Sequence, residues 1–207
     1  MAAIGILPLR STTSPSWVCH VMRDPLALLN DHAHLEKKAA SNALELLHRW
    51  PPESDEALAQ HWVRTLTGVA RDEVEHLASV CRQLARRGGR LSKMHRNPYA
   101  AALRDRVRIG EGNDELGDRL MVCALIELRS CERFEMLARH VEDQELARLY
   151  QRLSISEQGH YLVFVDLARR ITSERVSEPR WQQWLDVEAE IMTAQHPGTG
   201  MHSWIAE

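Results

Sequence analysis

Apolar residues recur along most of the chain at the three- and four-residue spacing of amphipathic helices, and no segment shows the strict alternation of a strand. The pair Asp24-Pro25 is a helix start signal, because Asp accepts hydrogen bonds from free backbone amides and Pro fits the first turn. A first helix is therefore predicted from this pair to about Trp50, where Pro51-Pro52 ends it.

Four further helices, and a short one in the connector, are predicted after this stop. The second begins at Ser54 or Asp55 and reaches about residue 87, where Gly88-Gly89 ends it. Residues 88–112 form an irregular connector, with a short helix after Asn97-Pro98. Continuing periodicity predicts a third helix from residue 113 or 114 to about 140, a fourth from a turn at 142–143 to about 170, and a shorter fifth from about 177 to 195. The remaining tail is expected to be irregular.

Four long helices in two pairs, with one long connector between the pairs, match the plan of a four-helix bundle with a single crossover. We therefore expect an all-α chain forming one domain over residues 1–207. Its core bundle would span about 24–170 with the crossover at 88–112, and residues 171–207 would add the C-terminal helix and tail.

The composition of the 207 residues narrows the class of protein. A hydrophobic content of 44% with 27% charged residues excludes a disordered chain. No uncharged run is long enough to span a bilayer, and the first residues make a poor secretory signal. The four cysteines contain no Cys-x-x-Cys pair, which disfavours zinc-ribbon and thioredoxin-type proteins. We expect a cytoplasmic protein with reduced thiols and no membrane partner.

Glu-x-x-His occurs twice, as Glu73 with His76 on the second helix and as Glu157 with His160 on the fourth. Positions three apart lie on one face of a helix, so each motif can direct a carboxylate and an imidazole at one point. Di-metal carboxylate bundles use two such motifs and one Glu from each of the other two helices.

The first helix supplies its carboxylate as Glu36, in the middle of an apolar stripe made by Leu29, Ala33, Ala40, Ala43, Leu44 and Leu47. The third helix offers Glu127, Glu132 and Glu135. We choose Glu127, because it shares its face with apolar residues, whereas Glu132 shares a face with Arg129 and Glu135 that is expected to be solvated. His32, four residues before Glu36, is expected to be partly exposed.

The predicted carboxylates also lie at matching depths in the bundle. Glu36 precedes Pro51 by 15 residues and Glu73 follows Glu56 by 17, while Glu127 and Glu157 lie at similar distances from the turn at 142–143. Four buried carboxylates without a cation would carry a large desolvation and repulsion penalty, which two divalent ions would remove. This oxygen-rich set with two imidazoles favours iron or manganese.

Between Arg82 and Arg108 the chain carries nine Lys or Arg and one acid, a net charge of +8, so the remaining residues carry −11 of the formal total of −3. A block of like charge is commonly a solvated face. It can also bind phosphates, with His95 and Tyr99 stacking on single-stranded bases. The pattern alone does not identify the nucleic acid.

Several segments resemble the MiaE family of tRNA hydroxylases: His-Ala-His-Leu-Glu-Lys-Lys-Ala-Ala-Ser in the first helix, Arg-Asp-Glu-Val-Glu-His-Leu in the second, Leu-Ile-Glu-Leu-Arg-Ser-Cys-Glu-Arg-Phe in the third and Ser-Glu-Gln-Gly-His-Tyr in the fourth. The resemblance covers about residues 24–170. It implies a ferritin-like fold with two iron ions, and the ligands carried over by position are Glu36, Glu73, His76, Glu127, Glu157 and His160.

The resemblance further implies hydroxylation of the isopentenyl side chain of a 2-methylthio-isopentenyl adenosine beside the tRNA anticodon. Dioxygen would be the co-substrate and an external donor, a redox protein or small reductant, would supply electrons. No separate protein acid or base is assigned. The basic connector would contact the RNA, with these candidates: Arg86, Arg87, Arg90, Lys93, Arg96 and Arg104.

Two alternatives stay open from the residues alone. A ferritin- or rubrerythrin-like protein that oxidises iron or scavenges peroxide would use the same centre, although it has no evident use for the basic connector. A helical adaptor with buried ion pairs is the non-enzymatic alternative, which the helical phases of the six residues disfavour.

Overall fold

The computed structural model describes residues 7–51 and 55–205. These residues form helices and irregular segments, with no strand among them. The helices are α1 (Ser16–Val21), α2 (Pro25–Leu46), α3 (Glu56–Arg86), α4 (Pro98–Arg104), α5 (Asn113–His140), α6 (Gln144–Thr172) and α7 (Glu174–Thr193).

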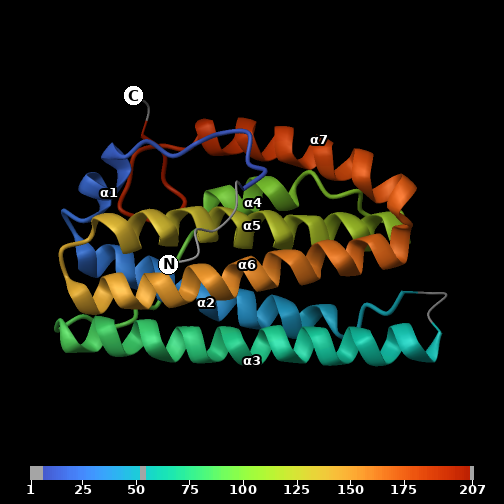
Figure 1. The fold of residues 1–207 in the computed structure, drawn as a ribbon, viewed down its shortest axis with the longest axis horizontal. Coiled ribbons are helices and arrows are strands. Elements are labelled where there is room, and N and C mark those ends of the chain that lie inside the picture. The colour runs from blue at the N-terminus through green and yellow to red at the C-terminus, as the bar shows by residue number, and fades with distance from the viewer. Residues whose placement is uncertain (1–6, 52–54, 206–207) are drawn as a thin grey trace.

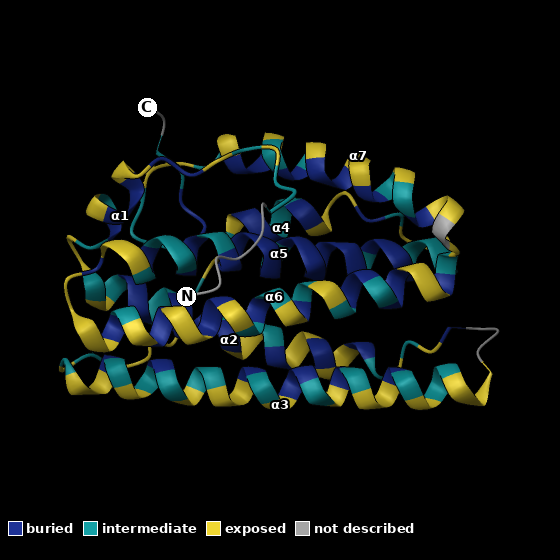
Figure 2. Cartoon of the chain, in the orientation of Figure 1, coloured by how far each residue is buried: buried dark blue, intermediate teal, exposed yellow. Residues whose placement is uncertain are grey.

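The four long helices lie side by side as two antiparallel pairs, α2 with α3 and α5 with α6 (Figure 1). The segment from α3 through α4 to α5 is the long crossover between the pairs. The helices α4 and α7 lie over α5 on the side away from α2 and α3, so α5 is buried along nearly its whole length (Figure 2). The all-α bundle with one long crossover and additional short helices is confirmed.

Side-chain caps begin the helices where the sequence predicts. Asp24 Oδ1 accepts a hydrogen bond from the Ala27 amide at 2.9 Å, and Asn97 Oδ1 accepts one from Ala100 at 3.1 Å. Asp55 caps α3; the alternative, Ser54, lies outside the described residues. Gly88 has a φ of +79°, the conformation that ends a helix most easily without a Cβ.

Two predicted helix bounds are wrong. The first long helix ends at Leu46 and not near Trp50, because a residue before proline is driven out of helical geometry and the chain unwinds ahead of Pro51. The last helix begins at Glu174, immediately after Ser173 reverses the chain with a φ of +64°. Pro179, near the predicted start, therefore lies inside α7. Leu44, at the edge of the α2 stripe, is exposed.

The helix α1 is not predicted by the sequence pattern, since six residues are too short to show a helical period. Trp17 holds it in place: the ring is fully buried, its Nε1 donates to Ser203 Oγ at 3.0 Å, and the Arg133 guanidinium lies 4.2 Å from the ring centroid. The amino-terminal segment and the irregular tail are thereby joined across α5.

The prediction that Arg129 and Glu132 face solvent is wrong. Arg129 is fully buried and donates to both carboxylate oxygens of Glu188 on α7 at 2.9 Å. Glu132 accepts from the backbone amide and the hydroxyl of Thr13 at 2.9 and 2.7 Å. The polar face of α5 is thus covered by α7 and the amino-terminal segment, which supply the opposite charge and hydrogen bonds.

Within residues 7–51 and 55–205, no helix combines the length and the apolar character needed to cross a bilayer.

The buried pair of Arg129 and Glu188 predicts a large effect on stability. Arg129→Met leaves the Glu188 carboxylate buried without its cation, so we expect the free energy of unfolding to fall by about 3–5 kcal/mol, measured by chemical denaturation. Breaking the exposed pair of α5 with Arg139→Met should cost less than about 1 kcal/mol. Equal effects of the two substitutions would contradict this assignment.

Candidate metal centre

The six residues predicted as metal ligands converge in the middle of the bundle, from one side chain each on α2 and α5 and two each on α3 and α6. They fall into two groups whose donor atoms lie within 4.8 Å of one another: Glu36, Glu73, His76 and Glu157, and Glu73, Glu127, Glu157 and His160. Glu73 and Glu157 belong to both groups. The geometry therefore offers two adjacent positions with two shared carboxylates.

The Glu-x-x-His motifs interlock across α3 and α6. His160 Nδ1 on α6 lies 2.7 Å from Glu73 Oε1 on α3 and 2.8 Å from Glu157 Oε2. In the reverse direction, His76 Nδ1 lies 3.1 Å from Glu157 Oε1. Each imidazole thus faces the carboxylates of both helices, so neither motif is complete without the other.

The negative charges of the four carboxylates at this centre destabilise one another. Burial, followed by repulsion from Glu73 and Glu157, raises the pKa of Glu36 well above its usual value, and the same causes raise the pKa of Glu127. Burial lowers the pKa of the two imidazoles, but their bonds to Glu157 and Glu73 outweigh it and raise the pKa of His76 to about 9 and of His160 to about 11. The set of side chains requires positive charge.

The hydrogen-bonding pattern fits a pair of metal ions. Both oxygens of Glu73, Glu157 Oε1 and His76 Nδ1 are buried without a hydrogen bond of acceptable geometry. Buried polar atoms are ordinarily satisfied, and at this centre the unsatisfied ones also include Nε2 of His160 and Nδ1 of His32. Carboxylate oxygens and imidazole nitrogens that point at a common space are suitable donors for iron.

Two neighbours of the centre are not identified correctly from the sequence. His32 is fully buried rather than partly exposed: its ring packs against those of Phe134 and Tyr150, which also contact each other, and its Nε2 is 2.5 Å from Glu36 Oε1. Burial lowers the pKa of His32 to about 3, so the neutral ring donates to the carboxylate. Sequence reasoning also misses Asp72. Its Oδ2 lies 3.6 Å from His160 Nε2, and its one sequence signal is its position directly before Glu73.

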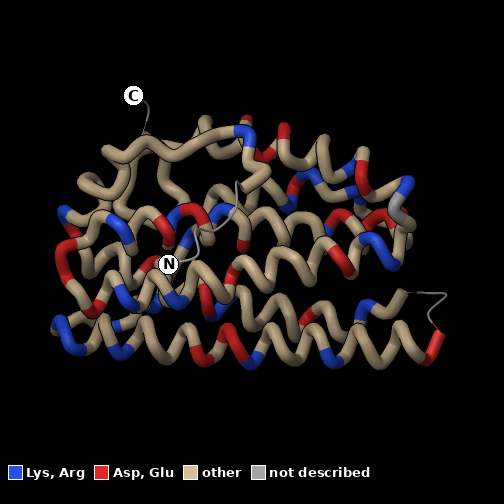
Figure 3. Tube along the Cα trace, in the orientation of Figure 1, with Lys and Arg blue, Asp and Glu red and all other residues tan. Residues whose placement is uncertain are grey.

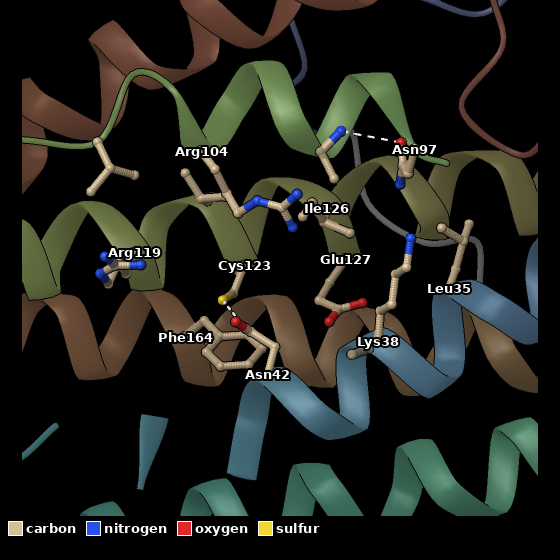
Figure 4. Close-up of a pocket in the computed structure, with 14 residues that line it drawn as sticks. Leu35, Lys38, Asn42, Asn97, Arg104, Arg119, Cys123, Ile126, Glu127 and Phe164 are labelled. Atoms are coloured by element: carbon tan, nitrogen blue, oxygen red, sulfur yellow. Dashed lines mark hydrogen bonds between the residues drawn. The ribbon is translucent and has the colours of Figure 1, made fainter. Parts of the chain in front are cut away.

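A pocket opens beside the centre, between α2, α4, α5 and α6 (Figure 4). Its cavity of about 100 Å³ is walled mainly by apolar side chains, among them Leu35, Ala39, Val122, Ile126 and Phe164. Glu127 also lines it, so the pocket reaches one of the six converging residues. Cys123 also lines it, and its Sγ accepts a hydrogen bond from Asn42 Nδ2 at 3.0 Å.

The basic residues of the connector do not form one uniform surface. Figure 3 shows basic positions at the end of α3, where Arg86 pairs with Glu145 at 3.3 Å and Arg87 with Asp143. Arg104 lies apart from them, at the pocket of the metal centre. Arg90, Lys93 and Arg96 are exposed on the connector.

The expectation that Tyr99 and His95 stack on RNA bases is wrong, because neither ring is available. Tyr99 is fully buried and donates to Glu188 Oε1 at 3.1 Å. The His95 side chain is 8% exposed, and it is bonded to Asp31 at 2.7 Å and stacked on His34. Both residues hold the connector against the bundle.

Comparison with known proteins agrees with this geometry. A family model described as tRNA-(MS[2]IO[6]A)-hydroxylase (MiaE) matches residues 4–203. A Pseudomonas putida protein named tRNA 2-(methylsulfanyl)-N(6)-isopentenyladenosine(37) hydroxylase is 38% identical over 162 residues, 78% of this chain and 75% of that protein. A protein of the same name from Salmonella typhimurium is 28% identical over 175 residues, 84% of this chain and 61% of that protein.

A solved structure also matches the fold. The protein, named Protein 43 with aldehyde deformylating oxygenase activity, from Synechococcus, superposes with a TM-score of 0.86 at 31% identity, covering 96% of this chain and 97% of that chain. The chain has the ferritin-like helical fold, and the match of the family model over nearly its whole length shows that it belongs to the MiaE family of tRNA hydroxylases.

Proposed function

We propose that this chain is a dioxygen-dependent di-iron monooxygenase, acting as a single domain, that hydroxylates the isopentenyl group of a 2-methylthio-isopentenyl adenosine next to the tRNA anticodon. The observation that carries the proposal is an apolar pocket that ends at Glu127, one of six converging carboxylates and imidazoles. The membership of the MiaE family supports the substrate. Because the substrate is tRNA, we expect the enzyme in the cytoplasm.

The proposed ligands divide between two iron ions. Glu36 and His76 would hold one, Glu127 and His160 the other, and Glu73 and Glu157, which belong to both donor groups, would be available to either ion. The four carboxylates match the four positive charges of two ferrous ions, with the imidazoles as neutral ligands. When bound, the iron pair would supply the reductive activation of dioxygen that hydroxylation of an allylic C–H bond requires.

The protein contributes positioning and the exclusion of water. Leu35, Ile126 and Phe164 line the path to Glu127, so an isopentenyl group can enter without an unpaired polar neighbour. His32 is bonded to Glu36 and packs against the rings of Phe134 and Tyr150, which fixes the orientation of that carboxylate. We assign no separate protein acid or base.

The stoichiometry of the reaction calls for an external reductant. Hydroxylation inserts one oxygen atom of dioxygen into a C–H bond and reduces the other to water, which consumes two electrons and two protons. Oxidation of the C–H bond supplies two of the four electrons that dioxygen takes up, and the substrate cannot supply the other two. We therefore expect a redox protein or small reductant as a partner.

The ferritin- or rubrerythrin-like alternative is not favoured. Oxidation of iron or removal of peroxide needs no apolar pocket for an organic group, whereas this pocket joins the centre to the surface between four helices.

We expect purified protein loaded with ferrous iron to hold about two metal ions per chain. Glu73→Ala and His160→Ala each remove donors from the centre, so both should lower the iron content to less than about one per chain, measured by elemental analysis. Glu75→Ala, on the exposed side of the same turn of α3, is the matched control and should keep full iron content. Full retention of iron by the first two variants would refute the ligand assignment.

Reduced protein incubated with dioxygen and prenylated tRNA should add 16 daltons to the methylthio-isopentenyl nucleoside, detected by mass spectrometry after digestion. Glu127→Ala should abolish the gain. A fatty aldehyde tested in parallel addresses the aldehyde deformylating oxygenase activity for which the Synechococcus protein is named. An unchanged nucleoside together with consumption of the aldehyde would overturn the proposed reaction.

Filling the pocket should stop the reaction without disturbing the metal centre. Ala39→Trp places a large ring where we expect the isopentenyl group, so hydroxylation should fall by on the order of a hundredfold while iron content stays full. Ser41→Trp, two residues away on the exposed side of α2, is the control and should keep nearly full activity. Equal activity of both variants would place the substrate elsewhere.

A further inference from the structure

Two cations stand at the opening of the pocket. Lys38 extends from α2 and Arg104 from α4, so they approach the pocket from opposite walls (Figure 4). Both residues line the pocket and both are exposed, which places them at its mouth rather than its base. Among the described residues, neither forms an ion pair with a carboxylate.

The positive charges of Lys38 and Arg104 make the mouth of the pocket suited to an anion. Two cations facing one space repel each other, and an anion bound between them would relieve the repulsion. Arg119, the third cation that lines the pocket, is already paired with Glu115 at 2.8 Å.

Lys38 is held in position by a chain of hydrogen bonds. His95 Nε2 lies 2.7 Å from Asp31 Oδ1, and His95 Nδ1 lies 2.8 Å from Lys38 Nζ. The carboxylate accepts from Nε2, which leaves Nδ1 free to accept from the ammonium. Asp31 is fixed in turn by the backbone amide of Met201 at 2.7 Å. The lysine is therefore positioned by the connector and the tail together.

The basic residues at 82–108 other than Arg104 are either paired with acids or lie away from the pocket. Arg86 and Arg87 pair with acids of the α5–α6 turn, and Arg108 pairs with Asp114 and Asp118. Arg90, Lys93 and Arg96 are exposed but do not line the pocket. Of the Lys and Arg residues that line the pocket, Lys38 and Arg104 are those without an ion pair among the described residues.

We propose that Lys38 and Arg104 bind the backbone phosphate of the nucleotide whose side chain enters the pocket, and that His95 is the positioning residue for Lys38. This inference rests on the proposed function. An apolar side chain inserted toward Glu127 leaves the sugar and phosphate of the same nucleotide at the mouth, where the guanidinium fork and the ammonium both suit phosphate oxygens. A neutral aldehyde would have no group for this pair.

The test compares RNA binding with turnover of the free nucleoside, using iron-loaded protein. For a prenylated anticodon stem-loop, Lys38→Gln and Arg104→Gln should each raise Kd by on the order of tenfold, because each removes a charge-assisted contact. Each should also lower the slope of log Kd against log salt by about 0.7–1. Turnover of the free nucleoside, which has no phosphate, should fall by a smaller factor than turnover of the stem-loop.

Lys37→Gln and Arg106→Gln are the matched controls, since each neutralises an exposed charge one or two residues away that does not line the pocket. Both should leave Kd within about twofold. His95→Phe should raise Kd for the stem-loop about threefold, while His95→Gln, which keeps an acceptor for Lys38, should restore it.

The outcomes separate this inference from the proposed function. Unchanged Kd and salt slope in Lys38→Gln and Arg104→Gln, or losses matched by the two controls, would overturn the phosphate site. Absence of RNA binding by the parent protein would overturn it as well. Failure of the parent protein to hydroxylate either the nucleoside or the stem-loop, with RNA binding sensitive to Lys38 and Arg104, would refute the reaction and leave the phosphate site standing.

Discussion

Four carboxylates share the middle of one hydrophobic bundle, and the rest of the structure depends on how this buried negative charge is balanced. Glu73 and Glu157 lie in both donor groups, so the two helix pairs meet at the point where charge is most concentrated. Desolvation and mutual repulsion would drive such a set apart unless positive charge lay between them. The balance of this charge therefore acts on the packing of all four long helices, each of which contributes to the two donor groups.

The same rule governs the outer layer of the molecule. Arg129 and Glu188 are fully buried, and each would be costly to bury without the other. Their pairing fixes α7 against α5, and Tyr99 adds α4 to the same carboxylate. These contacts hold in place the short helix that carries Arg104, so the buried ion pair supports one wall of the pocket mouth.

The spacing of apolar residues within one helix predicts which of its side chains face the core. The burial of the other side chains depends on which elements pack over them. Glu36, Glu73, Glu127 and Glu157 are correctly predicted in the core because their neighbours at three- and four-residue spacing are apolar. Arg129 and His32 are not, since their burial depends on α7 and on rings of α5 and α6 that helical spacing cannot specify. The helix α1 is not predicted because it has only six residues and because Trp17, one of its three buried residues, is held by a contact with the distant tail.

The net charge of the crossover does not show where its basic residues lie in the fold. A net charge of +8 within 27 residues suggests one basic surface, but the fold divides these residues among ion pairs at the end of α3, exposed connector positions and the pocket. Lys38, 44 residues before Arg82 in the sequence, joins Arg104 at the pocket mouth. Recognition of an anion depends on where cations meet without acids beside them, so a linear charge count identifies the kind of partner better than the place where it binds.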